Sequence, residues 1–64
     1  MKIEVKITTF CIRFKKHGNI TIITDDALEI ISSYELRINN TTINTGQYEI
    51  EGIDIIGVKY YNEI

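Results

Sequence analysis

Isoleucine supplies 15 of the 64 residues in this chain, and valine and threonine bring the β-branched residues to 24. Such side chains have restricted χ1 angles and pack well on the pleated surface of a strand. The apolar fraction is 44% and the formal net charge is −2. This ordinary apolar content and small net charge exclude the disordered class. The longest unbroken apolar run is Phe10-Cys11-Ile12, which excludes a membrane span. The composition therefore predicts one small, strand-rich domain over residues 1–64.

The N-terminal third predicts a long, bent β-hairpin. Residues 2–7 alternate apolar and charged side chains, and residues 10–15 alternate in the opposite phase. Two threonines separate these segments without any turn residue, so we expect a β-bulge or bend within one strand. Residues 16–19 contain glycine and asparagine, which favour a turn, and residues 20–24 form the expected returning strand.

The apolar period then changes from two residues to that of a helix. Thr24 precedes two aspartates, a pattern typical of a helix N-terminus, where free backbone N–H groups accept a cap and negative charge is favoured. Four apolar residues follow at helical spacing: Ala27, Ile30, Ile31 and Tyr34. We therefore expect one short helix near residues 25–33.

The second half returns to strands. Segments 34–38 and 53–61 alternate, and shorter strands are expected around Ile43 and residues 48–51, with Gly52 marking a bulge or bend. The predicted class is α+β, a small antiparallel sheet in the order β-β-α-β-β-β. The alternative is a small closed barrel of the SH3-like or Sm-like type, with the helix plugging one end.

No set of residues has the spacing that catalysis or metal binding needs. Cys11 is the only cysteine and His17 the only histidine, and neither has an orienting carboxylate at a useful spacing. Helix capping accounts for the acidic residues near position 26. The core of so short a chain leaves little room for a substrate pocket. We expect a protein that is not an enzyme and that uses no metal or other cofactor.

Charge is divided unevenly along the chain. Residues 1–19 carry five basic residues and one acidic residue, a net of +4, whereas residues 20–64 carry two basic and eight acidic residues, a net of −6. The basic hairpin at residues 13–17 would bind phosphates through Arg13, Lys15 and Lys16. An acidic ridge would instead dock on a basic partner through Glu49, Glu51 and Asp54. In the third interpretation, the two groups pair with each other across the sheet.

These patterns favour a small protein-interaction module, a regulator or inhibitor of a larger protein partner. Its expected interaction residues are the acidic ridge and Tyr61, an exposed aromatic near the end of the last strand. The alternative is a small nucleic-acid-binding β domain. Uncovered strand edges predict a homodimer. The single cysteine and the lack of a secretory signal favour a cytoplasmic protein without a membrane span. The bias towards Ile, Asn and Lys suggests an AT-rich genome, including that of a phage, virus or mobile element.

Overall fold

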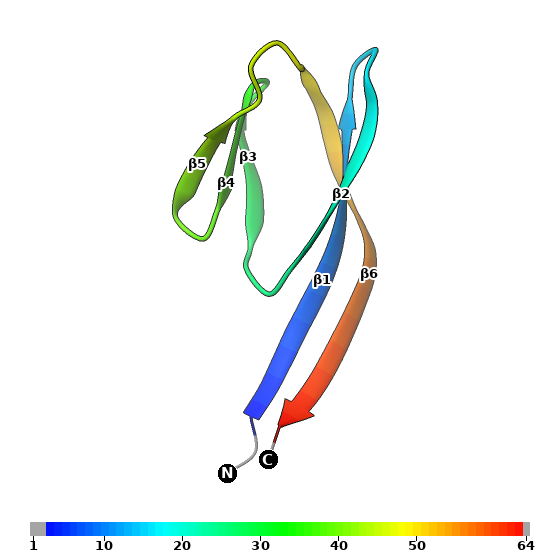
Figure 1. Cartoon of the computed structure of the whole chain (residues 1–64), viewed down its shortest axis with the longest axis vertical. Helices are drawn as coiled ribbons and strands as arrows, with labels where there is room; N and C mark the ends of the chain where they lie inside the picture. Colours follow the sequence, from blue (N-terminus) through cyan, green and yellow to red (C-terminus); the bar gives the residue numbers. More distant parts are fainter. Residues whose placement is uncertain (1–2, 64) are drawn as a thin grey trace.

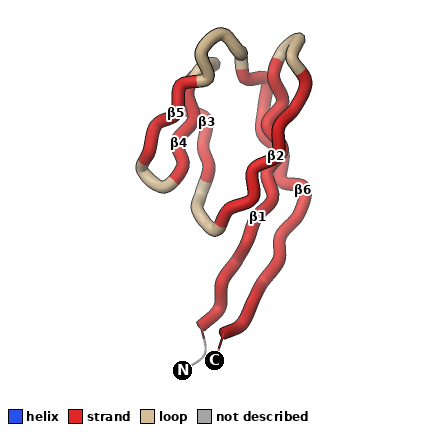
Figure 2. The backbone as a smooth tube through the Cα atoms, in the orientation of Figure 1, coloured by secondary structure: helices blue, strands red, loops and turns tan. Residues whose placement is uncertain are grey.

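The structure, a computed structural model, describes residues 3–63, and these residues contain strands and connecting loops but no helix (Figure 2). Six strands follow one another along the chain (Figure 1): β1 (Ile3–Phe14), β2 (Gly18–Thr24), β3 (Leu28–Ser32), β4 (Glu35–Ile38), β5 (Thr41–Asn44) and β6 (Ile50–Glu63). The long strands β1 and β6 span most of the length of the molecule.

The strands form two antiparallel sheets of three strands each. The first sheet has the order β2-β1-β6 and the second has the order β3-β4-β5. Because β2 pairs with β1 only from Thr8 onward, residues 3–7 of β1 and 59–63 of β6 continue alone as a two-stranded extension (Figure 1). We call this extension the stem. It places the first and last described residues, Ile3 and Glu63, opposite each other.

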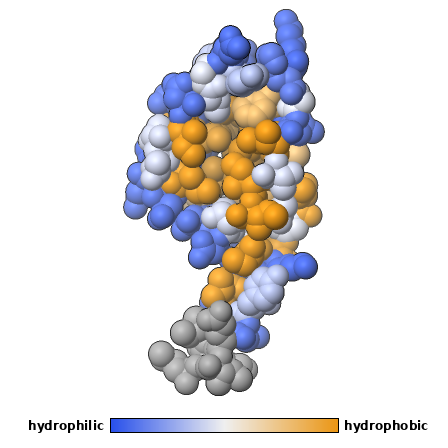
Figure 3. All heavy atoms as spheres, viewed as in Figure 1, coloured by the Kyte–Doolittle hydropathy of each residue, from blue (hydrophilic) through white to orange (hydrophobic). Residues whose placement is uncertain are grey.

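A small core joins the two sheets. Ile12 is completely buried, and Leu36 and Ile50 are 2% and 7% exposed. Partly buried apolar side chains surround these three residues: Phe14, Ile22, Leu28 and Ile53. The backbone N–H of Ile50 also donates a 2.7 Å hydrogen bond to the carbonyl of Ser33, which ties β6 to the second sheet. In Figure 3, apolar side chains run down the middle of the visible face, with polar side chains around them.

The predicted helix at residues 25–33 is wrong, so the chain is all-β rather than α+β. The hydroxyl of Thr24 accepts a 3.0 Å hydrogen bond from the N–H of Asp26 and stabilises a bend, not a helix. Leu28–Ser32 then pairs with Glu35–Ile38 as a hairpin. Threonine and serine hydroxyls that accept a hydrogen bond from a nearby backbone N–H favour turns. Isoleucine also has a lower helix propensity than unbranched residues.

The alternative SH3-like or Sm-like barrel is also wrong for the described part of the chain. The two sheets share no ladder, so the strands do not close into a barrel. They pack face to face through a few side chains, as in a very small sandwich. Short loops at residues 25–27 and 45–49 connect one sheet to the other.

The hairpin prediction is confirmed, with a correction to its faces. β1 is one strand, and β2 returns along it after a turn in which Lys16 and Gly18 have positive φ angles of 64° and 85°. The register shifts between Thr9 and Phe10 as expected, but the extra residue, Ile56, lies in β6. Because the bulge is not in β1, the alternation of β1 continues and Val5 and Ile7 face away from the core. Residue 2 lies outside the described residues.

A second register shift lies beside Gly52, where a bulge was predicted. Arg13 is opposite Gly52, whereas Phe14 is opposite Ile50, so Glu51 is the extra residue in β6. The predicted strands 48–51 and 53–61 are therefore parts of one continuous strand with two bulges. Bulges bend a strand and increase its twist, which suits the strongly curved path of β6 in Figure 1.

Candidate functional site

Arg13 joins two of the three predicted ridge carboxylates. It projects from β1 toward β6, where its Nε lies 2.7 Å from Oδ2 of Asp54 and its Nη1 lies 3.3 Å from Oε1 of Glu51. The bulge at Glu51 brings both carboxylates to the same guanidinium. All three side chains remain about half exposed, so each pair contributes at most about 1 kcal/mol to stability.

Lys15 holds the third ridge carboxylate. Its Nζ lies 2.9 Å from Oε2 of Glu49, and its backbone N–H donates a 2.9 Å hydrogen bond to the carbonyl of the same residue. The side-chain hydrogen bond to Glu49, followed by the charge of that carboxylate, raises the pKa of Lys15 above its ordinary value. Since the folded-state pKa is raised, the pair stabilises the fold fully below the ordinary lysine pKa. Its contribution is lost as the pH rises through the raised value.

These contacts show the third interpretation of the charge pattern, pairing across the sheet. Two basic and three acidic side chains at this end of β1 and β6 leave a net of 2 − 3 = −1. The three ridge carboxylates therefore lie at one end of β6, but Arg13 and Lys15 already balance most of their charge. A phosphate would have to displace carboxylates from Arg13 and Lys15. Only Lys16 of the predicted nucleic-acid site lies in an exposed turn without a described ion pair.

Gly52 makes the position of Arg13 possible, because the guanidinium lies across the glycine backbone. A Cβ at position 52 would clash with Nη2 of Arg13 and lie 3.2 Å from its Cζ. We expect Gly52→Ala to displace the guanidinium and to lower the free energy of unfolding by about 1 kcal/mol, the value of the exposed ion pairs.

Urea denaturation of a double-mutant cycle with Arg13→Ala measures this effect. The alanine at position 52 should cost clearly less when Arg13 is absent, because the clash is then removed. Equal costs in both backgrounds would show that the glycine serves the bulge backbone rather than the arginine. Gly57→Ala is the matched control, since its Cβ would lie 3.8 Å from Thr9, an ordinary contact.

Tyr61 lies on the stem, far from the ridge residues along β6. It is half exposed and lies opposite Val5. On the face of the first sheet that is turned away from the second sheet, it lines an apolar hollow together with Ile7 and Ile23. We call this surface the outer hollow; its other lining residues are Thr9, Gly57, Val58 and Lys59. The structure therefore separates Tyr61 from the acidic ridge.

Of the residues that line the outer hollow, only Tyr61 was expected from the sequence as a site residue, and the outward-facing positions of Ile23 and Ile7 were not expected. Ile23 is 67% exposed, although it follows Ile22, which packs against the core. Adjacent residues of a strand face opposite sides, so the Ile22–Ile23 pair was itself the signal for an outward-facing isoleucine. A bulge in β1 between residues 7 and 10, as the opposite phases suggested, would put Ile7 on the face of Phe10; the bulge lies in β6, so Ile7 faces outward.

Large apolar side chains are exposed over much of the described surface. Among the described side chains, only four hydrophobic residues are buried, whereas twelve large ones are at least 41% exposed, including Ile55, Ile56 and Tyr60 at about 60%. Isolated exposed apolar residues are ordinary, but contiguous groups of them mark contact surfaces. The outer hollow is such a group, and it carries no carboxylate.

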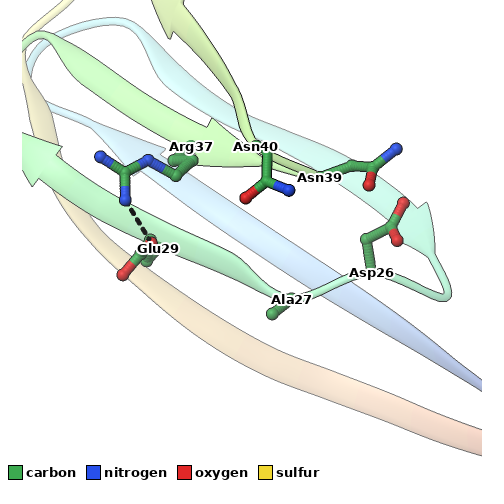
Figure 4. A pocket seen from close by; sticks show the side chains of 6 residues that line it. All are labelled: Asp26, Ala27, Glu29, Arg37, Asn39 and Asn40. Carbon is green, nitrogen blue, oxygen red and sulfur yellow. Dashed lines mark hydrogen bonds and ion pairs between the residues drawn. The ribbon is translucent and has the colours of Figure 1, made fainter.

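Two other surface features carry less chemistry. Figure 4 shows the side chains around a polar hollow beside the β4–β5 turn. The volume of this hollow is about 240 Å³, and Arg37 Nη1 lies 3.3 Å from Oε1 of Glu29 at its wall. This volume is below the roughly 300 Å³ at which small-molecule sites begin. In the turn between β1 and β2, His17 packs edge-on against Tyr48 of the loop before β6, with ring centroids 4.7 Å apart. That contact explains the histidine as a packing residue.

Within residues 3–63, no three His, Cys, Asp or Glu side chains come together as a metal site, and Cys11 is a free thiol. The same residues include no helix of the length and hydrophobicity that a membrane span requires. Comparison with protein families, with curated proteins and with solved structures finds no match to this chain.

Proposed function

We propose that the chain is a small non-catalytic protein-interaction module that regulates or inhibits a larger cytoplasmic protein by binding it through the outer hollow. The observation that carries this proposal is the exposure of Ile23 and Tyr61 around an apolar hollow on the outer face of the first sheet. Aromatic and aliphatic side chains that fill or line such hollows commonly anchor protein interfaces.

The residues that line the outer hollow indicate which chemical groups a partner surface needs in order to bind there. Its walls are aliphatic and aromatic, and Lys59 is its one charged residue. A partner segment with an apolar side chain and a neighbouring carboxylate would match both features. The nucleic-acid alternative is less favoured, because the described ion pairs occupy Arg13 and Lys15, two of its three basic residues.

Affinity capture with quantitative mass spectrometry, from lysate of the organism that encodes the chain, tests this function. A variant with both Ile23→Lys and Tyr61→Lys should capture at least about tenfold less of the partner, because it places charge in an apolar contact. The matched control carries Thr42→Lys and Gln47→Lys, which add the same charge at exposed positions of β5 and the following loop. The proposal fails if no protein is enriched by the wild-type chain, or if the hollow variant captures the same proteins as the control.

A further inference from the structure

The stem leaves one edge of β1 without a partner strand. Residues 3–7 of β1 pair with β6 on one side, but β2 begins to pair on the other side only at Thr8. A two-stranded ribbon is marginally stable in water, and an unpaired strand edge readily accepts another strand. The free stem edge of β1 is therefore the part of the first sheet that gains most from an added strand.

Other edges of the two sheets are less suited to pairing. β6 carries bulges at Glu51 and Ile56, which interrupt the regular spacing of hydrogen-bonding groups along most of its free edge, and only its stem part, residues 59–63, is regular. The edge strands of the second sheet, β3 and β5, contain one glutamate and no basic residue, so they hold no opposite-charge pair that would fix a register. The free edge of β2 carries no charged side chain to select one register over another.

The sequence of the stem edge is complementary to itself in one antiparallel register. If a two-fold axis passes through Val5, Glu4 of each copy lies opposite Lys6 of the other copy, and the two Val5 residues face each other. The same register places residue 3 opposite Ile7. Both charged side chains are exposed and the two aliphatic ones are half-buried, so all four are available at the surface.

The neighbouring symmetric registers are unfavourable. Moving the axis to Glu4 places two glutamates opposite each other, and moving it to Lys6 places two lysines opposite each other and drives the added strand into β2. Like charges directly opposite each other destabilise a strand pair. Charge and available edge length therefore select the same single register.

We propose that two copies of the chain associate through residues 3–7 of β1, antiparallel and centred on Val5. The two stems then form one sheet in the order β6-β1-β1-β6, and the two-fold axis closes the assembly at two copies. On its outer face, Val5 and the opposite Tyr61 of each copy form a row of four side chains. This inference goes beyond the proposed function, because it rests on the charge pattern of the stem rather than on the outer hollow.

Charge-reversal variants test the interface in the intact chain. Glu4→Lys and Lys6→Glu each place like charges opposite each other twice, so we expect each to weaken the dimer by about tenfold or more in sedimentation equilibrium. An equal mixture of the two variants restores both opposite-charge pairs and should form a heterodimer as tight as the wild type. A chain carrying both substitutions should also dimerise normally.

Matched controls separate this interface from others and from misfolding. Lys59→Glu reverses a charge on β6 of the stem and should leave dimerisation unchanged, and circular dichroism should show the same strand content in every variant. A wild-type chain that is monomeric at about 0.5 mM would overturn the proposal. So would two single variants that dimerise as the wild type does, or a mixture of them that stays monomeric. Capture of the larger partner by a monomeric Glu4→Lys chain would show that the two binding surfaces are independent.

Discussion

Truncation of Ile12 to alanine should remove most of the stability of this protein. Within the described part of the chain, Ile12 is the one large side chain with no exposed surface, and it lies on the central strand of the first sheet against Leu36 and Ile50. Cutting a buried isoleucine back to alanine costs about 2–5 kcal/mol, from lost burial and the cavity left behind. A chain of 64 residues has a total stability of roughly 3–10 kcal/mol, so a large unfolded fraction is expected.

Urea denaturation monitored by far-ultraviolet circular dichroism, at one fixed protein concentration, measures this loss. Ile23→Ala is the matched control, because Ile23 is 67% exposed and its truncation should change the free energy of unfolding by no more than about 0.5 kcal/mol. Equal losses from the two substitutions would contradict the assignment of Ile12 to the core and of Ile23 to the surface.

Leu36→Ala should detach the second sheet from the first. Leu36 is the only residue of β3, β4 or β5 that is fully buried, and it fills the space over Ile12 and Ile50. We expect a loss of about 2–4 kcal/mol that falls mainly on the second sheet, since its short strands have few other contacts with the rest of the chain.

Hydrogen exchange followed by NMR distinguishes local from global loss. In the Leu36→Ala variant, the amides of β3–β5 should lose protection far more than those of β1 and β6, which pair along nearly their whole length. Ile43→Ala is the control, because Ile43 lies opposite Leu36 in the same sheet but is 42% exposed. Uniform loss of protection across both sheets would show that the two sheets unfold as one unit.

The strands of this chain were largely predictable because their side chains alternate. β1 and β2 follow the alternation of a half-buried strand, whereas the short strand around Ile43 was predicted from the turn residues on either side of it. The sequence did not reveal that residues 25–33 form no helix, because Ile30 and Ile31 satisfy helical spacing as well as they satisfy a hairpin. The hydroxyls of Thr24 and Ser32 accept hydrogen bonds from the backbone N–H groups of Asp26 and Tyr34, which favours turns, and spacing alone does not reveal these bonds.

The candidate surfaces could not be predicted from residue spacing, because spacing does not show which strands are neighbours or which strand carries a bulge. Pairing of Arg13 with Asp54 requires that β1 and β6 be neighbours, although they are separated by four other strands in the sequence. The face of Ile7 depended on which of two strands carries a bulge, and a one-residue difference moves every following side chain to the other face. The composition of the outer hollow therefore became visible only with the sheet order.

The opposition of Ile3 and Glu63 also sets the order in which the protein can form. During synthesis, β1 finds β2 early, but its longest partner strand is the last one made. The central strand of the first sheet must therefore remain half-paired until nearly the whole chain is available. Folding of such a topology is slowed by the closure of a loop almost as long as the chain. Until then, the self-complementary segment of β1 has two free edges instead of one, and crowding of nascent chains on one messenger would favour premature pairing between them.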